Sequence, residues 1–403
     1  MKKKILIIGP GMEVGGVERS LIGLLNSFDY DKYDVDLFLL SHTGELMSLI
    51  NKNVNLLPEN QMFSLVSWPI VKLVKHQHFF IAGIRIISKI LGDIRAKLTK
   101  AESINITLCK KIVSAFVGPL PQDYDMALGF FAPHYFLENK VLAKVKVGWV
   151  HTDYTNSNEK PDVKFSSVMW EKLDYIACVS ENVKQSFDNV FPTLSNKTIV
   201  IENILSAEFV RKQAEVIEVA NEMPEDGNLK ILSVGRFCTA KAFDEAVVAC
   251  SVLVQNGYLI KWYLIGYGPD EQLIRNRIKE YHMEENVIIL GKKDNPYPYM
   301  KTCDIYVQPS RYEGKAVTVR EAQILNKPVM ITRFATSASQ VEEGIDGYIC
   351  EMGVNGIVEG LKYLVENIEI REQLIRNTRR KRYDNSSEKE KIFRLGEQQT
   401  NVQ

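Results

Sequence analysis

Short apolar runs rich in β-branched residues recur along this chain, and between them lie longer stretches whose apolar residues repeat at helical spacing. This alternation is typical of parallel sheets that are covered by helices on both faces. In the first half, the pattern predicts strands at Lys4–Ile8, Val35–Leu40, Met126–Phe130, Lys146–Val150, Tyr175–Val179 and Thr198–Ile201. A second series predicts strands at Lys230–Val234, Trp262–Ile265, Val287–Leu290, Ile305–Gln308, Val329–Thr332 and Tyr348–Cys350. We therefore expect an α/β protein with two doubly wound domains.

The polar segment Glu202–Asn228 separates the two series. It shows no strand pattern and ends in the breaker-rich run Met223-Pro224-Glu225-Asp226-Gly227-Asn228, which favours a domain junction. We predict an N-terminal domain over residues 1–205, a C-terminal domain over 206–380 and a polar tail over 381–403. The pattern leaves open whether this tail frays or forms a helix that packs on the first domain.

The composition is that of an ordinary folded protein, with 45% apolar and 25% charged residues among 403. Fifty Lys and Arg residues balance fifty Asp and Glu residues, which argues against a dedicated nucleic-acid binder. The six cysteines form no C-x-x-C pair, so neither a zinc ribbon nor a redox dithiol is indicated. His76 and His78 lack cysteine or carboxylate companions, and we predict no metal and no cofactor.

No stretch reaches the roughly 18 uncharged apolar residues that span a bilayer. The nearest, Phe79–Leu91, contains Arg85 and Lys89. The apolar run within Met1–Ile8 ends at Gly9, too short for a secretory signal, so a cytoplasmic location is expected.

The segment 63–115 departs from the α/β rhythm because it is helical by period and rich in basic residues. These are Lys72, Lys75, Arg85, Lys89, Arg95, Lys97, Lys100, Lys110 and Lys111, opposed by Asp93 and Glu102. The apolar residues Phe79, Phe80, Ile84, Ile87 and Leu91 interleave with these charges. Such a pattern is typical of a helix at an anionic membrane surface, and a solvated helical face is the alternative.

Three glycine or cation-bearing loops follow predicted strands and precede predicted helices. The first contains Gly15 and Gly16, the second holds Arg236 and Lys241, and the third is Gly266-Tyr267-Gly268. Glycine-rich loops at helix starts can bind phosphate groups through their backbone amides. The spacing here matches neither a dinucleotide fingerprint nor a P-loop. The alternative is that the glycines serve only the turn. Arg236 and Lys241 can clamp a diphosphate and stabilise its departure, unless they form an ordinary surface pair.

Two glutamates, Glu313 and Glu321, stand eight positions apart around the predicted start of a helix. If Glu313 ends the loop and Glu321 lies two turns into the helix, they share one face at about 12 Å or less. One carboxylate can then accept hydrogen bonds from sugar hydroxyls and the other from a ribose.

Together, these motifs resemble those of the retaining glycosyltransferases of family four, which have the GT-B fold. This bacterial group builds capsular, exopolysaccharide and lipid-linked glycans. The resemblance spans nearly the whole chain and rests on Gly15-Gly16-Val17-Glu18, Val234-Gly235-Arg236 with Lys241, Gly266-Tyr267-Gly268, and Glu313 with Glu321 before Lys327-Pro328-Val329. It implies two Rossmann-like domains that face each other across a cleft.

The resemblance also implies residue roles. Arg236 and Lys241 would hold the donor diphosphate, Glu321 the ribose and Glu313 the transferred sugar. His151, after a predicted strand, would face that sugar, although an unrelated strand-end histidine is the alternative. The remaining implied donor-binding residues are Gly15, Gly16, Gly266, Tyr267, Gly268, Gly314, Lys315 and Ala316.

Two positions depart from the family pattern. The usual Glu-Gly-Phe-Gly reads Glu313-Gly314-Lys315-Ala316, and the glycine that commonly follows the phosphate-binding lysine is Ala242. The first departure leaves the identity of the donor sugar open.

The implied activity is metal-independent transfer of a hexose from a UDP- or GDP-linked sugar with retention of configuration. The acceptor would be a lipid-linked oligosaccharide of a surface polysaccharide, at the inner face of the plasma membrane. A nucleotide-sugar epimerase on the same scaffold is the alternative enzyme. A two-domain sugar-binding protein is the non-enzymatic alternative.

Overall fold

The computed structural model describes residues 2–13, 15–101, 103–131, 134–152, 154, 161–314, 316–383, 385 and 387–398. The chain divides into two compact units. The first comprises Met1–Glu13, Leu24–Ile204 and Ser386–Gln403, and the second comprises Val14–Gly23 and Leu205–Asn385.

A seven-stranded parallel sheet forms the centre of the first unit, in the order β3-β2-β1-β4-β5-β6-β7. The strands are β1 (Lys3–Gly9), β2 (Tyr33–Leu39), β3 (Asn55–Leu56), β4 (Asp123–Gly129), β5 (Leu142–Val150), β6 (Tyr175–Cys178) and β7 (Thr198–Val200). The interior strand β1 buries the consecutive residues Ile5–Ile8 because helices cover both faces of the sheet.

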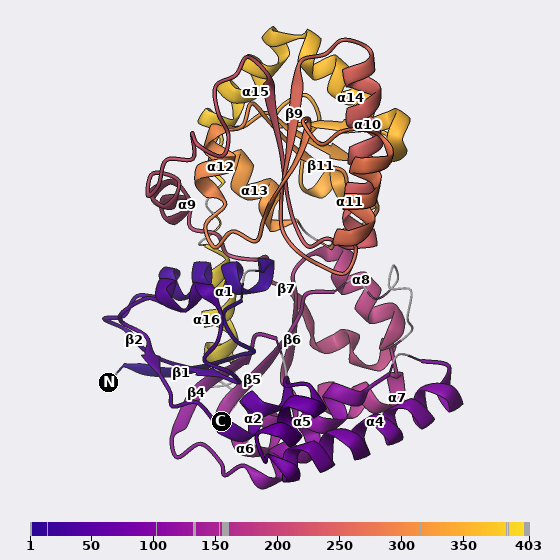
Figure 1. Cartoon of the computed structure of the whole chain (residues 1–403). Helices are drawn as coiled ribbons and strands as arrows, with labels where there is room; N and C mark the ends of the chain where they lie inside the picture. The colour runs from indigo at the N-terminus through magenta and orange to yellow at the C-terminus, as the bar shows by residue number, and fades with distance from the viewer. Residues whose placement is uncertain are drawn as a thin grey trace. The chain divides into compact units, whose positions relative to one another are not determined.

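Helices of the first unit surround this sheet (Figure 1). They are α1 (Gly16–Ser27), whose start groups with the second unit, η1 (Glu45–Leu49), α2 (Gln61–Val66), α3 (Ile70–Lys75), α4 (Phe79–Thr99), α5 (Asn105–Phe116), α6 (His134–Lys140), α7 (Val163–Glu171), α8 (Glu181–Val190), η2 (Pro192–Lys197) and α16 (Glu388–Gln398). Helix α8 begins after the N-cap Ser180, whose Oγ accepts a hydrogen bond from the Val183 amide at 3.2 Å.

The second unit contains a six-stranded parallel sheet in the order β10-β9-β8-β11-β12-β13. The strands are β8 (Leu229–Val234), β9 (Ile260–Ile265), β10 (Val287–Gly291), β11 (Ile305–Gln308), β12 (Val329–Thr332) and β13 (Tyr348–Cys350). Its helices are α9 (Ala207–Gln213), η3 (Thr239–Lys241), α10 (Phe243–Gln255), α11 (Glu271–Glu280), α12 (Tyr297–Thr302), α13 (Val317–Ile324), η4 (Ser337–Ser339), α14 (Gly353–Glu366) and α15 (Ile368–Arg380).

The second sheet separates two hydrophobic cores. Successive side chains of β8 point to opposite faces, so Ile231 packs with helices α10, α11 and α14 while Leu232 packs with α9, α12 and α13. Figure 1 shows these two groups of helices on either side of the strands.

The predicted α/β fold with two doubly wound units is confirmed. Every predicted strand is present within a few residues of its predicted bounds, and the shift from one unit to the other at Ile204 falls within the predicted junction Glu202–Asn228. The sequence analysis missed β3, an edge strand of two residues, and helix α9, which starts after the N-cap Ser206 inside that junction.

The polar C-terminal segment forms helix α16, which groups with the first unit. The Phe393 ring stacks on Tyr33 with ring centroids 4.4 Å apart and lies 5.7 Å from the Phe28 ring. The Lys389 ammonium donates a hydrogen bond to the Ser27 carbonyl at 2.7 Å. Figure 1 shows α16, in yellow, among elements of the first unit. The described part of the tail is therefore an ordered element.

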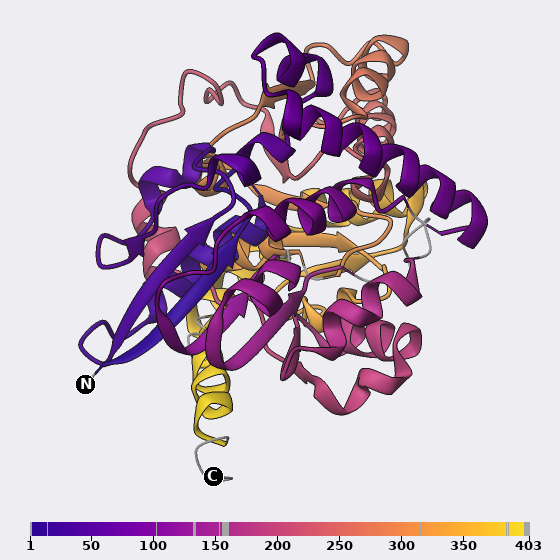
Figure 2. The same ribbon diagram turned by 90° about the horizontal axis from the view of Figure 1, so that it is seen from below.

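The basic segment 63–115 folds mainly as helices α2 to α5. Within the described part of the chain, none of the helices has the length and apolar character needed to cross a membrane. Helix α4 is the longest of the four and lies at the outside of the first unit (Figure 2). Ile84 does not join the exposed apolar residues as expected, because it is 7% exposed and faces the interior.

Candidate functional site

The candidate site lies in the second unit, where the strand order reverses. Strands β8 and β11 are neighbours, and from them the sheet continues to β9 on one side and β12 on the other. Loops at the carboxyl ends of such neighbouring strands line the ligand crevice of open α/β sheets. The loops that carry Arg236 and Glu313 leave the sheet at this edge.

The glycine turn after β9 fits closely against the loop after β8. The Gly235 amide donates to the Ile265 carbonyl at 3.0 Å, and the Phe237 amide donates to the Tyr267 carbonyl at 2.9 Å. Gly266 has φ of 153°, and a Cβ added there would lie 1.9 Å from the Gly235 carbonyl oxygen. Gly268 has φ of 158° and equally little space, with the Phe237 oxygen 2.3 Å from an added Cβ. The turn therefore requires glycine at both positions.

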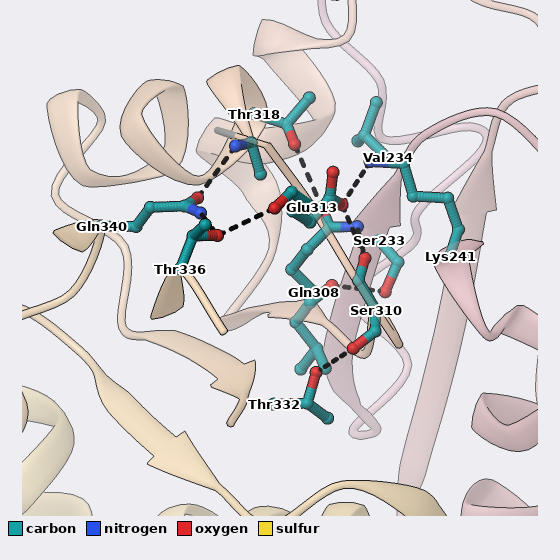
Figure 3. A network of polar contacts seen from close by, with 12 residues as sticks. Ser233, Val234, Lys241, Gln308, Ser310, Glu313, Thr318, Thr332, Thr336 and Gln340 are labelled. Atoms are coloured by element: carbon teal, nitrogen blue, oxygen red, sulfur yellow. Dashed lines mark hydrogen bonds and ion pairs between the residues drawn. The ribbon is translucent and has the colours of Figure 1, made fainter. Parts of the chain in front are cut away.

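Lys241 and Glu313 meet at the edge where β8 and β11 end. The Lys241 ammonium forms an ion pair with Glu313 Oε1, and the Ser310 hydroxyl donates to the same oxygen at 2.6 Å. The Lys241 and Glu313 side chains are only 18% and 10% exposed. Figure 3 shows Glu313 among these partners, with Thr336 donating its hydroxyl to the Glu313 carbonyl at 2.9 Å. The structure thus brings together two of the predicted site residues.

A buried network of hydrogen-bonded side chains holds Ser310 in place. Gln308 Nε2 donates to Ser310 Oγ at 2.9 Å, while the Tyr306 hydroxyl donates to Gln308 Oε1 at 2.9 Å. Thr318 donates its hydroxyl to the same amide oxygen at 3.2 Å. Burial raises the pKa of Tyr306, so its hydroxyl remains a donor. The sequence analysis missed this network, although a glutamine that ends an otherwise apolar strand was a signal for it.

The loop beyond Glu313 is held by Gln340. Its Oε1 accepts a hydrogen bond from the Ala316 amide at 2.9 Å, and its Nε2 donates to Thr336 Oγ1 at 3.0 Å (Figure 3). Gly314 is partly buried in this loop, and Lys315 lies outside the described residues. The backbone on both sides of the predicted sugar contact is therefore anchored.

Arg236 and Lys241 differ in their surroundings. Arg236 is exposed, and within the described ranges it has no ion pair or hydrogen bond from its guanidinium. The Lys241 stem instead lies over Gly235, where an added Cβ would be 3.3 Å from Lys241 Cδ. Ala242 then adopts the left-handed conformation, with φ of 52°. Glycine adopts this conformation without strain. Ala242, which departs from the family pattern, adopts it at some conformational cost.

Glu321 is fully buried and belongs to a separate network. Tyr297 donates its hydroxyl to Glu321 Oε1 at 2.7 Å, and Arg19 Nη1 lies 3.3 Å from Oε2. The Arg19 guanidinium is also 5.6 Å from the centroid of the Tyr297 ring. Burial, followed by the Glu321 charge, raises the pKa of Tyr297. Burial opposes the charge on Arg19, but Glu321 and its other neighbours leave the pKa of Arg19 raised.

The relation of the two glutamates differs from the expectation. Helix α13 begins at Val317, so Glu313 precedes the helix and Glu321 lies just over one turn into it. The glutamates therefore do not share one helical face. Sequence reasoning missed Arg19 and Tyr297, although an arginine directly after the Gly15-Gly16-Val17-Glu18 motif marked the first of them.

His151 follows β5 in the first unit, and its surroundings favour the uncharged imidazole. Its Nε2 lies 2.8 Å from the Phe130 carbonyl oxygen, which can only accept, so Nε2 carries the hydrogen. Burial lowers the pKa of His151 to about 4, although this hydrogen bond raises it in part. Its role toward a donor sugar stays a prediction.

The remaining predicted residues border these loops. Gly16 begins α1, and an added Cβ would lie 3.8 Å from Val317 Cγ2; at Gly15 it would lie 2.2 Å from Glu18 Oε2. The Tyr267 ring is 42% exposed, with the Lys292 ammonium 4.9 Å from its centroid.

The described residues contain no group of three or more His, Cys, Asp or Glu side chains placed to hold a metal ion. All six cysteines are free thiols, and only Cys238 among them is partly exposed.

Comparison with known proteins finds a similarity to glycosyltransferases, mainly in the second unit. Residues 217–381 match the family model described as Glycosyl transferases group 1. The chain is 25% identical over 217 residues to the N-acetyl-alpha-D-glucosaminyl L-malate synthase of Bacillus anthracis, covering 53% of this chain and 56% of the relative. It is 26% identical over 208 residues to N-acetylgalactosamine-N,N'-diacetylbacillosaminyl-diphospho-undecaprenol 4-alpha-N-acetylgalactosaminyltransferase of Campylobacter jejuni, covering 51% and 54%. The chain thus spans about half the length of the curated relatives it matches.

The fold likeness covers almost the whole chain. A crystal structure of Anabaena Alr3699/HepE in complex with UDP and glucose matches with a TM-score of 0.69 and 15% identity, over 98% of this chain and 99% of that one. At this identity, the likeness establishes the fold alone. Together with the two Rossmann-like units, it assigns the GT-B architecture.

Proposed function

We propose that this protein is a retaining hexosyltransferase that uses a nucleoside-diphosphate sugar as donor. The observation that carries the proposal is the meeting of Lys241 and Glu313 at the switch point of the second sheet, on the same strand edge as the exposed Arg236. This arrangement offers cations for a diphosphate beside a carboxylate for sugar hydroxyls. The group 1 glycosyltransferase match over residues 217–381 and the fold likeness to a UDP complex support it.

In the proposed reaction, the bond between the sugar C1 and the diphosphate oxygen breaks while an acceptor oxygen bonds to C1 from the same face. The proton of the acceptor hydroxyl passes to the departing phosphate oxygen. Arg236 and Lys241 stabilise the negative charge that develops on the diphosphate, so the proposed reaction needs no metal ion. Glu313 accepts hydrogen bonds from the sugar and orients it.

Retention follows from attack on the side from which the diphosphate leaves. Within this proposal, Glu321 binds the donor ribose only after the residues that cover it, Tyr297 and Arg19 among them, move, because its side chain is 0% exposed. UDP and GDP are the donor nucleotides to be tested first. UDP is bound, together with glucose, in the structure of Anabaena Alr3699/HepE.

The proposed acceptor is a lipid-linked oligosaccharide, in the synthesis of a surface polysaccharide at the inner face of the plasma membrane. The name of the Campylobacter relative specifies a diphospho-undecaprenol substrate, and that of another relative, CapM of Staphylococcus aureus, specifies capsular polysaccharide biosynthesis. The exposed basic and apolar surface of the first unit also supports a membrane-bound acceptor.

Transfer from radiolabelled UDP and GDP sugars to short prenyl-diphosphate oligosaccharides tests the proposal. Glu313→Gln and Arg236→Ala should each lower the rate by at least about 100-fold with an unchanged melting temperature. Arg275→Ala is the matched control, because Arg275 is exposed on α11 and pairs only with its helical neighbour Glu271 among the described residues. Near-normal rates in either site variant would reject the assigned site.

The two alternatives give different products. An epimerase would convert the donor sugar when no acceptor is present, and analysis of the recovered nucleotide sugars detects this. A sugar-binding protein would leave both donor and acceptor unchanged.

A further inference from the structure

Helix α4 exposes large apolar side chains to solvent along its length, and we name this set the α4 stripe. It consists of Phe79, Phe80, Ile86, Ile87, Ile90, Leu91, Ile94 and Leu98, which are 43–80% exposed. The opposite face of the helix, including Ile81, Ile84 and Ser88, is buried against the first unit. The stripe follows a helix of 21 residues, about 30 Å long, so it is far larger than the scattered apolar residues of an ordinary surface.

Positive charge surrounds the α4 stripe. Helices α3 and α4 with the residues that join and follow them, 70–100, contain seven Lys and Arg residues and a single acid, Asp93. Lys72, Lys75, Lys89, Lys97 and Lys100 are exposed. The Asp93 carboxylate already accepts hydrogen bonds from Asn105 Nδ2 at 2.9 Å and Ser103 Oγ at 3.2 Å. The stretch 70–100 therefore carries an excess of six positive charges over its one acid.

An aromatic and basic cluster lies directly before the stripe. The Lys72 ammonium is 3.7 Å from the centroid of the Trp68 ring, and the rings of His76 and His78 lie 5.6 and 5.9 Å from it. Val71, on α3, is an apolar residue that is 80% exposed. Trp and Lys side chains beside exposed apolar residues are typical of protein segments that lie at a membrane–water interface.

We infer that the α4 stripe and its lysines dock this protein on an anionic lipid bilayer. The inference rests on the proposed function, because it brings a lipid-linked acceptor to the enzyme. A second copy of the chain fits this surface less well. In a twofold-symmetric dimer, the same surface patch faces itself, so lysines would oppose lysines across the stripe. An anionic bilayer neutralises them while its acyl region receives the apolar side chains.

Trp68 supplies an intrinsic probe for this docking. The protein has four tryptophans, and Trp149, Trp170 and Trp262 are buried at 5% exposure or less. Only the partly exposed Trp68 can respond to a change of solvent. Titration with phosphatidylglycerol vesicles in low salt should shift the emission to the blue, and the protein should float with the vesicles. Phosphatidylcholine vesicles should give neither effect, and 0.5 M salt should release the protein.

Two pairs of variants separate apolar from charged contributions. Leu98→Asp should lower vesicle affinity by about tenfold or more, whereas Leu259→Asp, at a leucine of similar exposure on the second unit, should not change it. Replacing Lys89 and Lys97 by Gln should lower affinity by about fivefold for each lysine. The same replacement of Lys279 and Lys362, which are exposed on α11 and α14, is the control.

These measurements need no donor or acceptor, so their outcome is independent of the proposed reaction. Equal binding to neutral and anionic vesicles, or unchanged affinity in Leu98→Asp with its melting temperature preserved, would overturn the inference. A dimer in solution that Leu98→Asp dissociates would assign the stripe to a second copy and reject the membrane. If the unmodified protein binds anionic vesicles but transfers no hexose, the result would count against the proposed function and not against the membrane docking.

Discussion

Lys241 and Glu313, which are 72 positions apart in the sequence, form an ion pair at the carboxyl edge of the second sheet. The pair joins the predicted phosphate-binding cation to the predicted sugar-binding carboxylate. In the proposed reaction, a diphosphate that approaches Lys241 also changes the charge environment of Glu313. The two residues should therefore act as one unit.

A double-mutant cycle tests this coupling. We expect Lys241→Ala and Glu313→Gln each to lower kcat/KM by about 100- to 1,000-fold, since each removes stabilisation of developing charge or sugar orientation. The double variant should be much less impaired than the product of the two single effects. Steady-state rates for the four proteins measure this. Fully multiplicative effects would mean that the residues act independently.

The Arg19–Glu321–Tyr297 network predicts a stability effect that is separate from donor binding. Glu321→Gln leaves Arg19 buried without its opposite charge and should lower the free energy of unfolding by about 3–5 kcal/mol. Adding Arg19→Met removes that unpaired charge and should restore most of the loss. Urea unfolding measures both changes.

The same double variant separates structure from ribose binding. If Glu321 binds the ribose, the restored protein should still have a raised KM for the donor. A normal KM in a stable Arg19→Met, Glu321→Gln protein would show that Glu321 has only a structural role.

His151 should make stability depend on pH in the acid range. Because burial lowers the pKa of His151 to about 4 in the folded protein, the unfolded chain, with a pKa near 6.5, binds the proton first as pH falls. The stabilisation is thus complete above pH 6.5 and is lost between about pH 6.5 and 4. His151→Asn should show a shallower fall of melting temperature over this interval than the parent protein. Parallel curves would contradict a buried neutral imidazole.

The glycine turn after β9 predicts a steric effect. In Gly266→Ala, the added Cβ would lie 1.9 Å from the Gly235 oxygen, so the two loops must separate and we expect a loss of at least about 3 kcal/mol of unfolding free energy. Gly291→Ala is the matched control, because Gly291 also has positive φ, at 72°, but open space around an added Cβ. It should lose only about 1 kcal/mol, from backbone strain. If denaturant titrations show equal losses of unfolding free energy for the two variants, the effect would come from the backbone conformation and not from the close contact with Gly235.

Strand positions were predictable because parallel strands buried on both faces are nearly continuous apolar runs. Ile305–Gln308 and Val329–Thr332 were predicted with their final bounds for this reason. The edge strand β3 has two residues and cannot produce such a signal. Helix α9 escaped notice because it lies inside a polar junction and depends on the Ser206 cap.

The site was predictable only as far as single loops carry it. The glycines of the turn at Gly266 and the residues Lys241 and Glu313 stand in local motifs that also fix their positions relative to a strand. The partners that hold these residues in place are not part of the local motifs. Gln340 and Thr336, for example, bind Glu313 and its loop from a segment that follows β12. Likewise, nothing near Glu321 in the sequence indicates that Arg19, 302 positions away, occupies its carboxylate. Such contacts depend on how distant parts of the chain pack together, and residue spacing within a motif cannot predict them.

The return of the chain to the first unit through α16 determines how hybrid enzymes should be built. Residues 205–385 are flanked on both sides by segments of the first unit, so most of the second unit is an insertion within the first. An exchange of everything after residue 205 would graft a foreign helix onto Tyr33 and Phe28. Chimaeras that exchange the second unit should therefore join near 204 and 385 and keep the native terminal helix with its own partner. They should also match Val14–Gly23 to the exchanged segment, because this stretch belongs to the second unit and its Arg19 pairs with Glu321.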